Sequence, residues 1–397
     1  MKLLYIVNGL GFATNVSLGG SDKRAMEIGA RLQKVGHEIF VLTTPVGHQL
    51  LQDNLTVTYF VIKEPFFLRG NIKNTVLGRF MAYCYLGFTT CFYPFKERFD
   101  VVFPTSDFFF DVVPAISCKV RRISKKMISI IHHVILEPLK RKGGIFKNLS
   151  LYFLQRMSFV FIAVFSDKVF VYATKEGKKI KEILGRSFKV ADTHIASVVC
   201  GIDLKKMEKV TLQDKEYVAC FIGGLRPVKG LNDFVPIWKA VVEHDKSAKL
   251  LIVGGGLSNY IEHLSAQIRD AGLENNVILM IGHLEEGRLY EMMGSAKLLI
   301  LPSYEEGWSI IICEALSLGL PAVVYDLEVF EIFADAVFRV RLGDTKAFAK
   351  AILDIMNDDV LCEKARKNAL SVSKRFDWDK AALIEEQLLS AVIAEDK

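Results

Sequence analysis

The chain has 397 residues, 51% of them hydrophobic and 24% charged, which indicates an ordered globular protein with room for two domains. No run reaches 18 uninterrupted apolar residues, so no membrane-spanning helix is predicted, and the apolar N-terminus leads straight into a glycine-rich loop, unlike a signal peptide. The seven cysteines are scattered without a CxxC pair, which favours a reduced, cytoplasmic protein without structural zinc.

Charge is distributed unevenly along the chain. Residues 1–200 carry 28 Lys and Arg against 14 Asp and Glu, whereas the remainder carries 23 against 31. The first half also holds 21 of the 28 phenylalanines. A basic, Phe-rich half indicates contact with an anionic, apolar partner, for which a membrane surface fits better than nucleic acid.

The chain begins with a predicted buried strand over residues 3–7, followed by a glycine-rich loop. Gly19 and Gly20 would let the backbone approach a ligand closely, and Ser21 or Asp22 could cap the helix that follows. A further strand is expected over residues 38–43.

Residues 65–95 are aromatic and apolar with sparse charge, and two interpretations stay open. The segment is either a buried helix of the first domain or an interfacial segment with aromatic anchors beside basic residues. Residues 119–147 form the most basic stretch, which is either a solvated face or a surface for anionic lipid. Residues 149–165 are apolar nearly all round and are predicted to be a buried helix.

The remaining strands of the first half are expected at residues 100–103, 127–131 and 167–173, and a helix is expected to begin at Thr174. The strand 127–131 ends at His132 and His133. Beyond residue 208, strands at 217–222, 250–253 and 277–281 alternate with helical patterns. This alternation predicts a parallel, doubly wound sheet.

The stretch Leu298–Pro321 carries the chemical signal. A buried strand is followed by a loop with Glu306, then by a helix that Ser309 would cap and that Gly319 would end. With Glu306 in the loop and Glu314 in the helix, two carboxylates can line one elongated pocket. The amides of Gly307, Trp308 and Ser309 would offer a seat for phosphate between them. Such a pocket fits a nucleotide sugar.

The pattern P-S-x-x-E-G-x7-E-A-L-x-x-G-x-P over residues 302–321 resembles the E-x7-E signature of retaining glycosyltransferases of family 4, also called glycosyl transferases group 1. The resemblance implies the GT-B fold, an α/β architecture of two Rossmann-like domains that face a cleft. The domains would be residues 1–207 on the acceptor side and 208–375 for the nucleotide sugar, and residues 376–397 would form a helix returning to the first domain.

The resemblance also assigns roles to residues. His132 or His133 would face the sugar, and the sequence does not choose between them. Lys229 would bind the donor diphosphate, whereas the arginine that the family places at position 224 is replaced by Gly224 and an arginine occurs instead at Arg226. The other donor-binding positions implied are Gly19, Gly20, Gly255, Gly282, Glu306, Gly307, Trp308, Ser309 and Glu314.

These expectations define a retaining hexosyl- or glycosyltransferase of polysaccharide biosynthesis that moves a sugar from a nucleotide-diphosphate donor to a hydroxyl of a glycan or lipid-linked acceptor. No cofactor or metal is expected, since no DxD motif is evident. The protein is expected in the cytoplasm, with peripheral contact to an anionic membrane through its basic first domain and no nucleic-acid partner. The alternatives are a nucleotide-sugar epimerase of the same fold and a catalytically weak relative that binds a nucleotide sugar or glycan.

Overall fold

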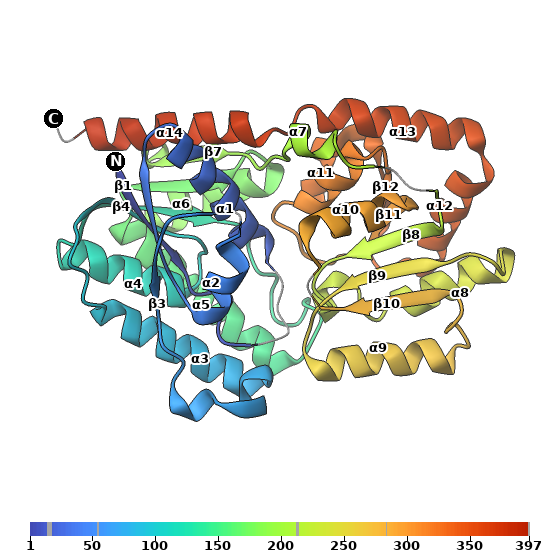
Figure 1. Ribbon diagram of the computed structural model, residues 1–397, viewed down its shortest axis with the longest axis horizontal. Coiled ribbons are helices and arrows are strands. Elements are labelled where there is room, and N and C mark those ends of the chain that lie inside the picture. The colour runs from blue at the N-terminus through green and yellow to red at the C-terminus, as the bar shows by residue number, and fades with distance from the viewer. Residues whose placement is uncertain (14–17, 54, 212–213, 283, 396–397) are drawn as a thin grey trace.

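The computed structural model describes residues 1–13, 18–53, 55–211, 214–282 and 284–395. Two parallel sheets lie side by side, with helices packed against each (Figure 1). The first has seven strands in the order β3-β2-β1-β4-β5-β6-β7, and the second has six in the order β10-β9-β8-β11-β12-β13. In both sheets the strand order reverses direction near the middle, which is the doubly wound topology that the sequence predicts. The expected fold class is confirmed.

The first sheet and its helices occupy the chain up to Val198. Its strands are β1 (Lys2–Val7), β2 (Glu38–Thr43), β3 (Thr58–Val61), β4 (Phe99–Pro104), β5 (Ser124–Ile131), β6 (Lys168–Tyr172) and β7 (Ile195–Val198). Its helices are α1 (Gly20–Lys34), α2 (Pro45–Leu51), α3 (Val76–Thr89), α4 (Phe109–Val120), α5 (Ile145–Phe165) and α6 (Lys175–Phe188), with short 3-10 turns η1 (Phe66–Leu68), η2 (Gly70–Asn74), η3 (Thr90–Phe92) and η4 (Asp192–His194).

The second sheet follows a short linking helix, α7 (Leu204–Met207). Its strands are β8 (Tyr217–Ile222), β9 (Leu250–Gly254), β10 (Val277–Ile281), β11 (Ala296–Leu301), β12 (Ala322–Tyr325) and β13 (Val337–Val340). The helical elements are η5 (Pro227–Lys229), α8 (Phe234–His244), α9 (Ser258–Asp270), α10 (Glu286–Gly294), α11 (Ile310–Ser317), η6 (Glu328–Ala336), α12 (Thr345–Asn357), α13 (Asp359–Ser373) and α14 (Trp378–Ala394). The expected boundary between residues 207 and 208 falls between the two sheets.

The strands are buried because parallel sheets are covered on both faces. All six residues of β8 are buried, and β11 has one exposed residue, Lys297, near its start. The core of the second domain is therefore continuous from its sheet to α8, α11 and α12. This packing fixes the carboxyl ends of the strands, where the loops of the candidate site begin.

The C-terminal helix α14 returns across the first domain, at the top of Figure 1, and packs against α1 and β7. Trp378 is buried at its start. Arg24 of α1 forms a fully buried ion pair with Glu385 of α14. Removing one partner of such a pair would leave an uncompensated buried charge, so the pair fixes α14 on the first domain.

Two predictions about the first domain are wrong in detail. The helix α1 begins at Gly20 with Gly19 as its N-cap, two residues before Ser21 and three before Asp22, the predicted capping positions. The Asp22 carboxylate lies inside the first turn and accepts a hydrogen bond from the Gly19 amide at 2.9 Å. It therefore stabilises the helix start from within the helix, where the positive end of the dipole favours a carboxylate.

Residues 149–165 form a helix as predicted, but the prediction that this helix is buried is wrong. In α5 the polar residues Asn148, Gln155 and Ser158 are buried, whereas Phe146 and Phe153 are 85% and 61% exposed. Gln155 faces inward because its amide hydrogen-bonds the Asp107 carboxylate and the backbone of the loop after β5. By length and composition α5 could span a membrane. In the most apolar 18-residue stretch of α5, 28% is buried inside the protein.

Candidate functional site

The candidate site lies between the carboxyl ends of the two sheets, where open α/β sheets bind ligands. The start of α1 in the first domain faces the start of α11 in the second. A methyl group added to Gly20 would lie 3.8 Å from the Ile310 side chain, so the two helix starts approach each other across the domain boundary. Gly19 and Gly20 are both exposed at this point.

Lys229 and Glu306 meet near the interface between the domains. Lys229 ends η5 after β8, Glu306 lies in the loop after β11, and the ammonium and carboxylate are 2.6 Å apart. Both side chains are partly buried. The two residues come from neighbouring strands of one sheet, which brings together groups 77 positions apart in sequence.

The backbone of residues 307–309 lies against the strand end of the opposite domain. A methyl group on Gly307 would lie 2.3 Å from the His132 carbonyl oxygen, so this approach requires glycine. The amides of Gly307, Trp308 and Ser309 donate no hydrogen bond to another described residue. Ser309 is the N-cap residue of α11 by position, but its buried hydroxyl caps no amide among the described residues. The start of α11 therefore keeps donors that no described residue engages.

Glu314 lies on α11 and is engaged by the first domain. Its carboxylate receives hydrogen bonds from Lys23 of α1 and from the Tyr290 hydroxyl of α10, and Lys23 also binds Glu286 at 2.6 Å. Burial alone would lower the pKa of Lys23, but Glu314 and Glu286 raise it above its ordinary value. Lys23 thus occupies the space in front of Glu314, one of the donor-binding positions that the resemblance implies.

The two histidines after β5 differ in their surroundings. The His132 ring is satisfied at both nitrogens, since Nε2 donates to the Thr105 carbonyl and Nδ1 accepts from the Tyr172 hydroxyl, both at 2.8 Å. The His133 ring has no hydrogen-bond partner in the described part of the chain and lies within electrostatic range of Lys229 and Glu306. Burial lowers the pKa of each histidine to about 4, so both rings are neutral near pH 7.

Arg226 lies over the glycine that replaces the family arginine. A methyl group on Gly224 would lie 3.2 Å from Arg226 Nε and 3.6 Å from its Cζ. The guanidinium of Arg226 therefore covers the space through which a side chain at position 224 would leave the backbone. Glu306, Arg141 and Arg79 are its charged neighbours.

The two remaining predicted glycines lie at adjacent strand ends of the same sheet. Gly255 follows β9, and its carbonyl accepts the Leu225 amide at 2.8 Å. Gly282 follows β10 with φ of 121°, a backbone conformation that favours glycine. Residues 14–17 of the glycine-rich loop, and His283, which follows Gly282 in the sequence, lie outside the described residues.

Two functional candidates escaped sequence reasoning. Lys23 and Arg141 belong to the first domain, but each pairs with a carboxylate of the second, Glu314 and Glu305 respectively. Arg141 Nε lies 2.8 and 3.0 Å from the two oxygens of Glu305. Nothing in the sequence signals either pair, because each depends on how the two domains dock.

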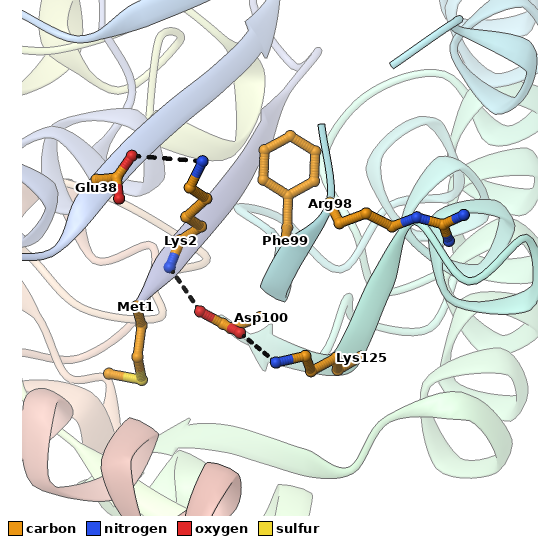
Figure 2. A pocket seen from close by; sticks show the side chains of 7 residues that line it. All are labelled: Met1, Lys2, Glu38, Arg98, Phe99, Asp100 and Lys125. Atoms are coloured by element: carbon orange, nitrogen blue, oxygen red, sulfur yellow. Dashed lines mark hydrogen bonds and ion pairs between the residues drawn. The ribbon is translucent and has the colours of Figure 1, made fainter. Parts of the chain in front are cut away.

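A hollow of about 390 Å³ lies elsewhere, at the amino ends of β1, β2, β4 and β5 (Figure 2). Ion pairs line it in Figure 2, between Lys2 and Glu38 at 3.6 Å and between Asp100 and Lys125 at 2.8 Å. It lies at the end of the first sheet opposite the glycine-rich loop, about 16–20 Å away along β1 at the usual rise per residue. Within the residues that the structure describes, no group of three His, Cys, Asp or Glu could hold a metal ion.

Comparison with known proteins shows what the second domain is similar to. Residues 203–372 match the family model described as glycosyl transferases group 1. The chain is 25% identical over 239 residues to the O-antigen chain mannosyltransferase RfbU of Salmonella typhimurium, covering 58% of this chain and 65% of that protein. It is 23% identical over 282 residues to the Escherichia coli UDP-Gal:alpha-D-GlcNAc-diphosphoundecaprenol alpha-1,3-galactosyltransferase, covering 65% of this chain and 69% of that protein.

The fold comparison covers the whole chain. The structure of Anabaena Alr3699/HepE in complex with UDP-glucose is similar with a TM-score of 0.71 at 17% identity, covering 98% of this chain and 100% of that one. At this identity the likeness establishes the fold alone. In the first three curated relatives the chain spans 46%, 65% and 41% of their own lengths.

Proposed function

Because residues 203–372 match the glycosyl transferases group 1 family and the chain has the GT-B fold, we propose that it is a retaining glycosyltransferase. It moves a sugar from a nucleotide-diphosphate donor to a hydroxyl of a lipid-linked or glycan acceptor. Two similar proteins support the donor and acceptor classes: HepE was solved with UDP-glucose, and the Escherichia coli relative is named for a diphosphoundecaprenol substrate.

The observation that carries this proposal is the pairing of Lys229 with Glu306 at 2.6 Å beside the free amides at the start of α11. A cation and a positive helix end in one place suit a diphosphate, and the adjacent carboxylate suits sugar hydroxyls. In the proposed complex Lys229 turns from Glu306 to the diphosphate and stabilises its charge as the bond to the sugar breaks. Glu306 is then free to orient the sugar.

The opposite wall of the donor site comes from the first domain. We assign the sugar-facing role to His133, since both nitrogens of His132 are already bonded. A neutral His133 can donate one hydrogen bond to a sugar hydroxyl without adding a charge. Glu314 would bind the ribose after Lys23 moves away from it. No carboxylate is assigned as a covalent nucleophile, and no metal or cofactor is invoked.

The first domain presents apolar side chains to its surroundings in two helical stripes. On α3 and η3 the stripe is Leu77, Phe80, Phe88 and Phe92, and on α5 it is Phe146, Leu149, Phe153 and Val164. Both helices pack against α4. Several exposed apolar side chains aligned on one domain mark a contact surface. The net charge of +14 over residues 1–200 suits anionic lipid. We therefore propose peripheral attachment to the cytoplasmic membrane face through α3 and α5.

A donor panel tests the enzymatic proposal. Nucleotide released from UDP-, GDP- and ADP-sugars is measured with and without acceptor extract for the wild type, Lys229→Ala, Glu306→Ala and the control Lys249→Ala, a half-exposed lysine directly before β9. We expect turnover of one donor class, a loss of at least about tenfold in the first two variants and none in the control. Epimer formation without acceptor would instead identify an epimerase, and absence of turnover with every donor would contradict the proposal.

A further inference from the structure

Cationic side chains gather at the interface between the two domains, and two of them have no carboxylate partner there within the residues that the structure describes. Glu306 pairs with Lys229 and Glu305 pairs with Arg141, which leaves both carboxylates engaged. The guanidinium groups of Arg79 and Arg226 have no hydrogen-bond or ion-pair partner among the described residues, and Arg79 Nε is buried. We refer to Arg79, Arg141, Lys147 and Arg226 as the cationic cluster.

The members of the cationic cluster come from separate elements and converge. Arg79 lies on α3, Arg141 in the loop after β5, Lys147 near the start of α5 and Arg226 after β8. Lys147 reaches across to the second domain, where its ammonium lies 3.5 Å from the Tyr260 hydroxyl of α9. Burial and then the charges of Arg141, Arg226 and Arg79 lower the pKa of Lys147, as expected for cations held together.

Holding like charges together costs free energy unless an anion joins them. The Lys229 pair, the start of α11 and Arg226 lie at the donor end of the cluster and account for a donor diphosphate. Arg79 lies farther into the first domain, where it lines a small hollow with Tyr83 and the glycine-rich loop residues Gly11 and Phe12. The cluster therefore extends from the donor site toward the acceptor side of the gap.

The cluster also adjoins the two apolar stripes. Arg79 directly precedes Phe80 on α3, and Lys147 directly follows Phe146 on α5. Consecutive helical residues point about 100° apart, so each helix directs a cation toward the gap and a phenylalanine outward. An anionic headgroup on the cluster would thus have its hydrocarbon chain beside Phe80 and Phe146, which are 52% and 85% exposed.

We infer that the cationic cluster is a subsite for the phosphate or diphosphate of a lipid-linked acceptor, whose hydrocarbon chain runs onto the stripes of α3 and α5. This inference rests on the proposed glycosyl transfer and specifies its acceptor. The anionic group anchors the acceptor at a fixed depth, and its sugar or hydroxyl end extends toward His133 and the donor.

Binding of three probes tests this subsite: decaprenyl diphosphate and decaprenol in the same nonionic detergent micelles, and inorganic pyrophosphate alone. Affinities are measured by thermophoresis for the wild type, Arg79→Gln and Lys147→Gln. The matched control is Lys140→Gln, which removes an exposed lysine paired with Glu137 on the same loop as Arg141. UDP affinity is measured for every protein as a check on folding and on the donor site.

We expect the wild type to bind the lipid diphosphate at least about tenfold more tightly than the alcohol, and each of the two variants to lose about tenfold of the diphosphate affinity. Affinities for decaprenol and UDP should not change, and Lys140→Gln should behave as wild type. Equal wild-type affinity for the two lipids, or an unchanged preference in both variants, would overturn the subsite. Pyrophosphate binding as tight as the lipid diphosphate would overturn its lipid part. A wild-type protein that does not bind UDP would instead contradict the proposed function.

Discussion

Arg226 offers a specific test of how this chain binds a donor without the arginine expected at position 224. The guanidinium of Arg226 lies against the Cα of Gly224, with only 3.2 Å between its Nε and the position of a Cβ there. If Arg226 supplies the missing phosphate contact, Arg226→Ala should weaken UDP binding. The double variant Gly224→Arg/Arg226→Ala should then restore it, because the second substitution vacates the space that the new side chain needs.

The magnitude follows from the kind of contact that is lost. A hydrogen bond between a guanidinium and a phosphate contributes roughly 1.5–3 kcal/mol, which corresponds to roughly a 10- to 150-fold change in dissociation constant. Gly224→Arg alone should bring no gain, since its Cβ would crowd Arg226 and place two guanidinium groups side by side. The double variant should come within about threefold of the wild type.

Isothermal titration calorimetry with UDP measures all four proteins directly. Arg269→Ala serves as a control because it removes an exposed arginine from α9 of the same domain. The reasoning would be refuted if Arg226→Ala bound UDP as tightly as the wild type. A double variant that bound UDP no better than Arg226→Ala would also refute it, since an arginine at position 224 would then not replace the contact that Arg226 makes.

Three further predictions concern the membrane, the sugar and stability. Phe146→Ser should lower partitioning onto phosphatidylglycerol-containing vesicles about 10- to 50-fold in co-sedimentation, because inserting a phenylalanine side chain into the membrane contributes about 2 kcal/mol. The control Val360→Ser, which removes a similarly exposed residue of α13, should have no effect. Equal pelleting of the two variants would contradict the proposed membrane surface. His133→Ala should lower kcat/KM about tenfold and His133→Gln less. With a pKa of about 4 His133 stays neutral above pH 5, so a pH–rate limb between pH 6 and 7 that disappears in His133→Gln would oppose this assignment. Burial raises the pKa of Asp107 to about 6, so its ionisation destabilises the fold as pH rises from 4 to 7. Over that range the free energy of unfolding of Asp107→Asn, measured with urea, should rise by up to about 3 kcal/mol relative to that of the wild type. A difference that does not change with pH would exclude this ionisation.

Much of the scaffold could be predicted from local sequence. The strand Glu38–Thr43 has the expected bounds, and α6 begins after Thr174, whose hydroxyl accepts the Gly177 amide. Gly319 ends α11 with φ of 75°. These features depend on a few neighbouring residues, namely an apolar run, a capping hydroxyl and a left-handed glycine, so the sequence contains all that determines them.

The errors occur where tertiary contacts decide. An apolar helix is ordinarily covered by its own protein, so residues 149–165 were predicted to be buried. In the structure Asn148 and Gln155 face inward, because they bond the loop after β5, and the phenylalanines of α5 are left outside. The choice between His132 and His133 has the same origin, since neighbouring strand residues point in opposite directions and only the positions of Tyr172 and Thr105 show which ring is satisfied.

The most direct test of the central claim is a crystal structure of the protein with UDP. We expect the diphosphate against the amides of Gly307, Trp308 and Ser309, with the Lys229 ammonium moved from Glu306 to a phosphate oxygen and the ribose hydroxyls on Glu314 in place of Lys23. A nucleotide bound outside the gap between the domains, or one that leaves both the Lys229–Glu306 and the Lys23–Glu314 pairs intact, would contradict the account.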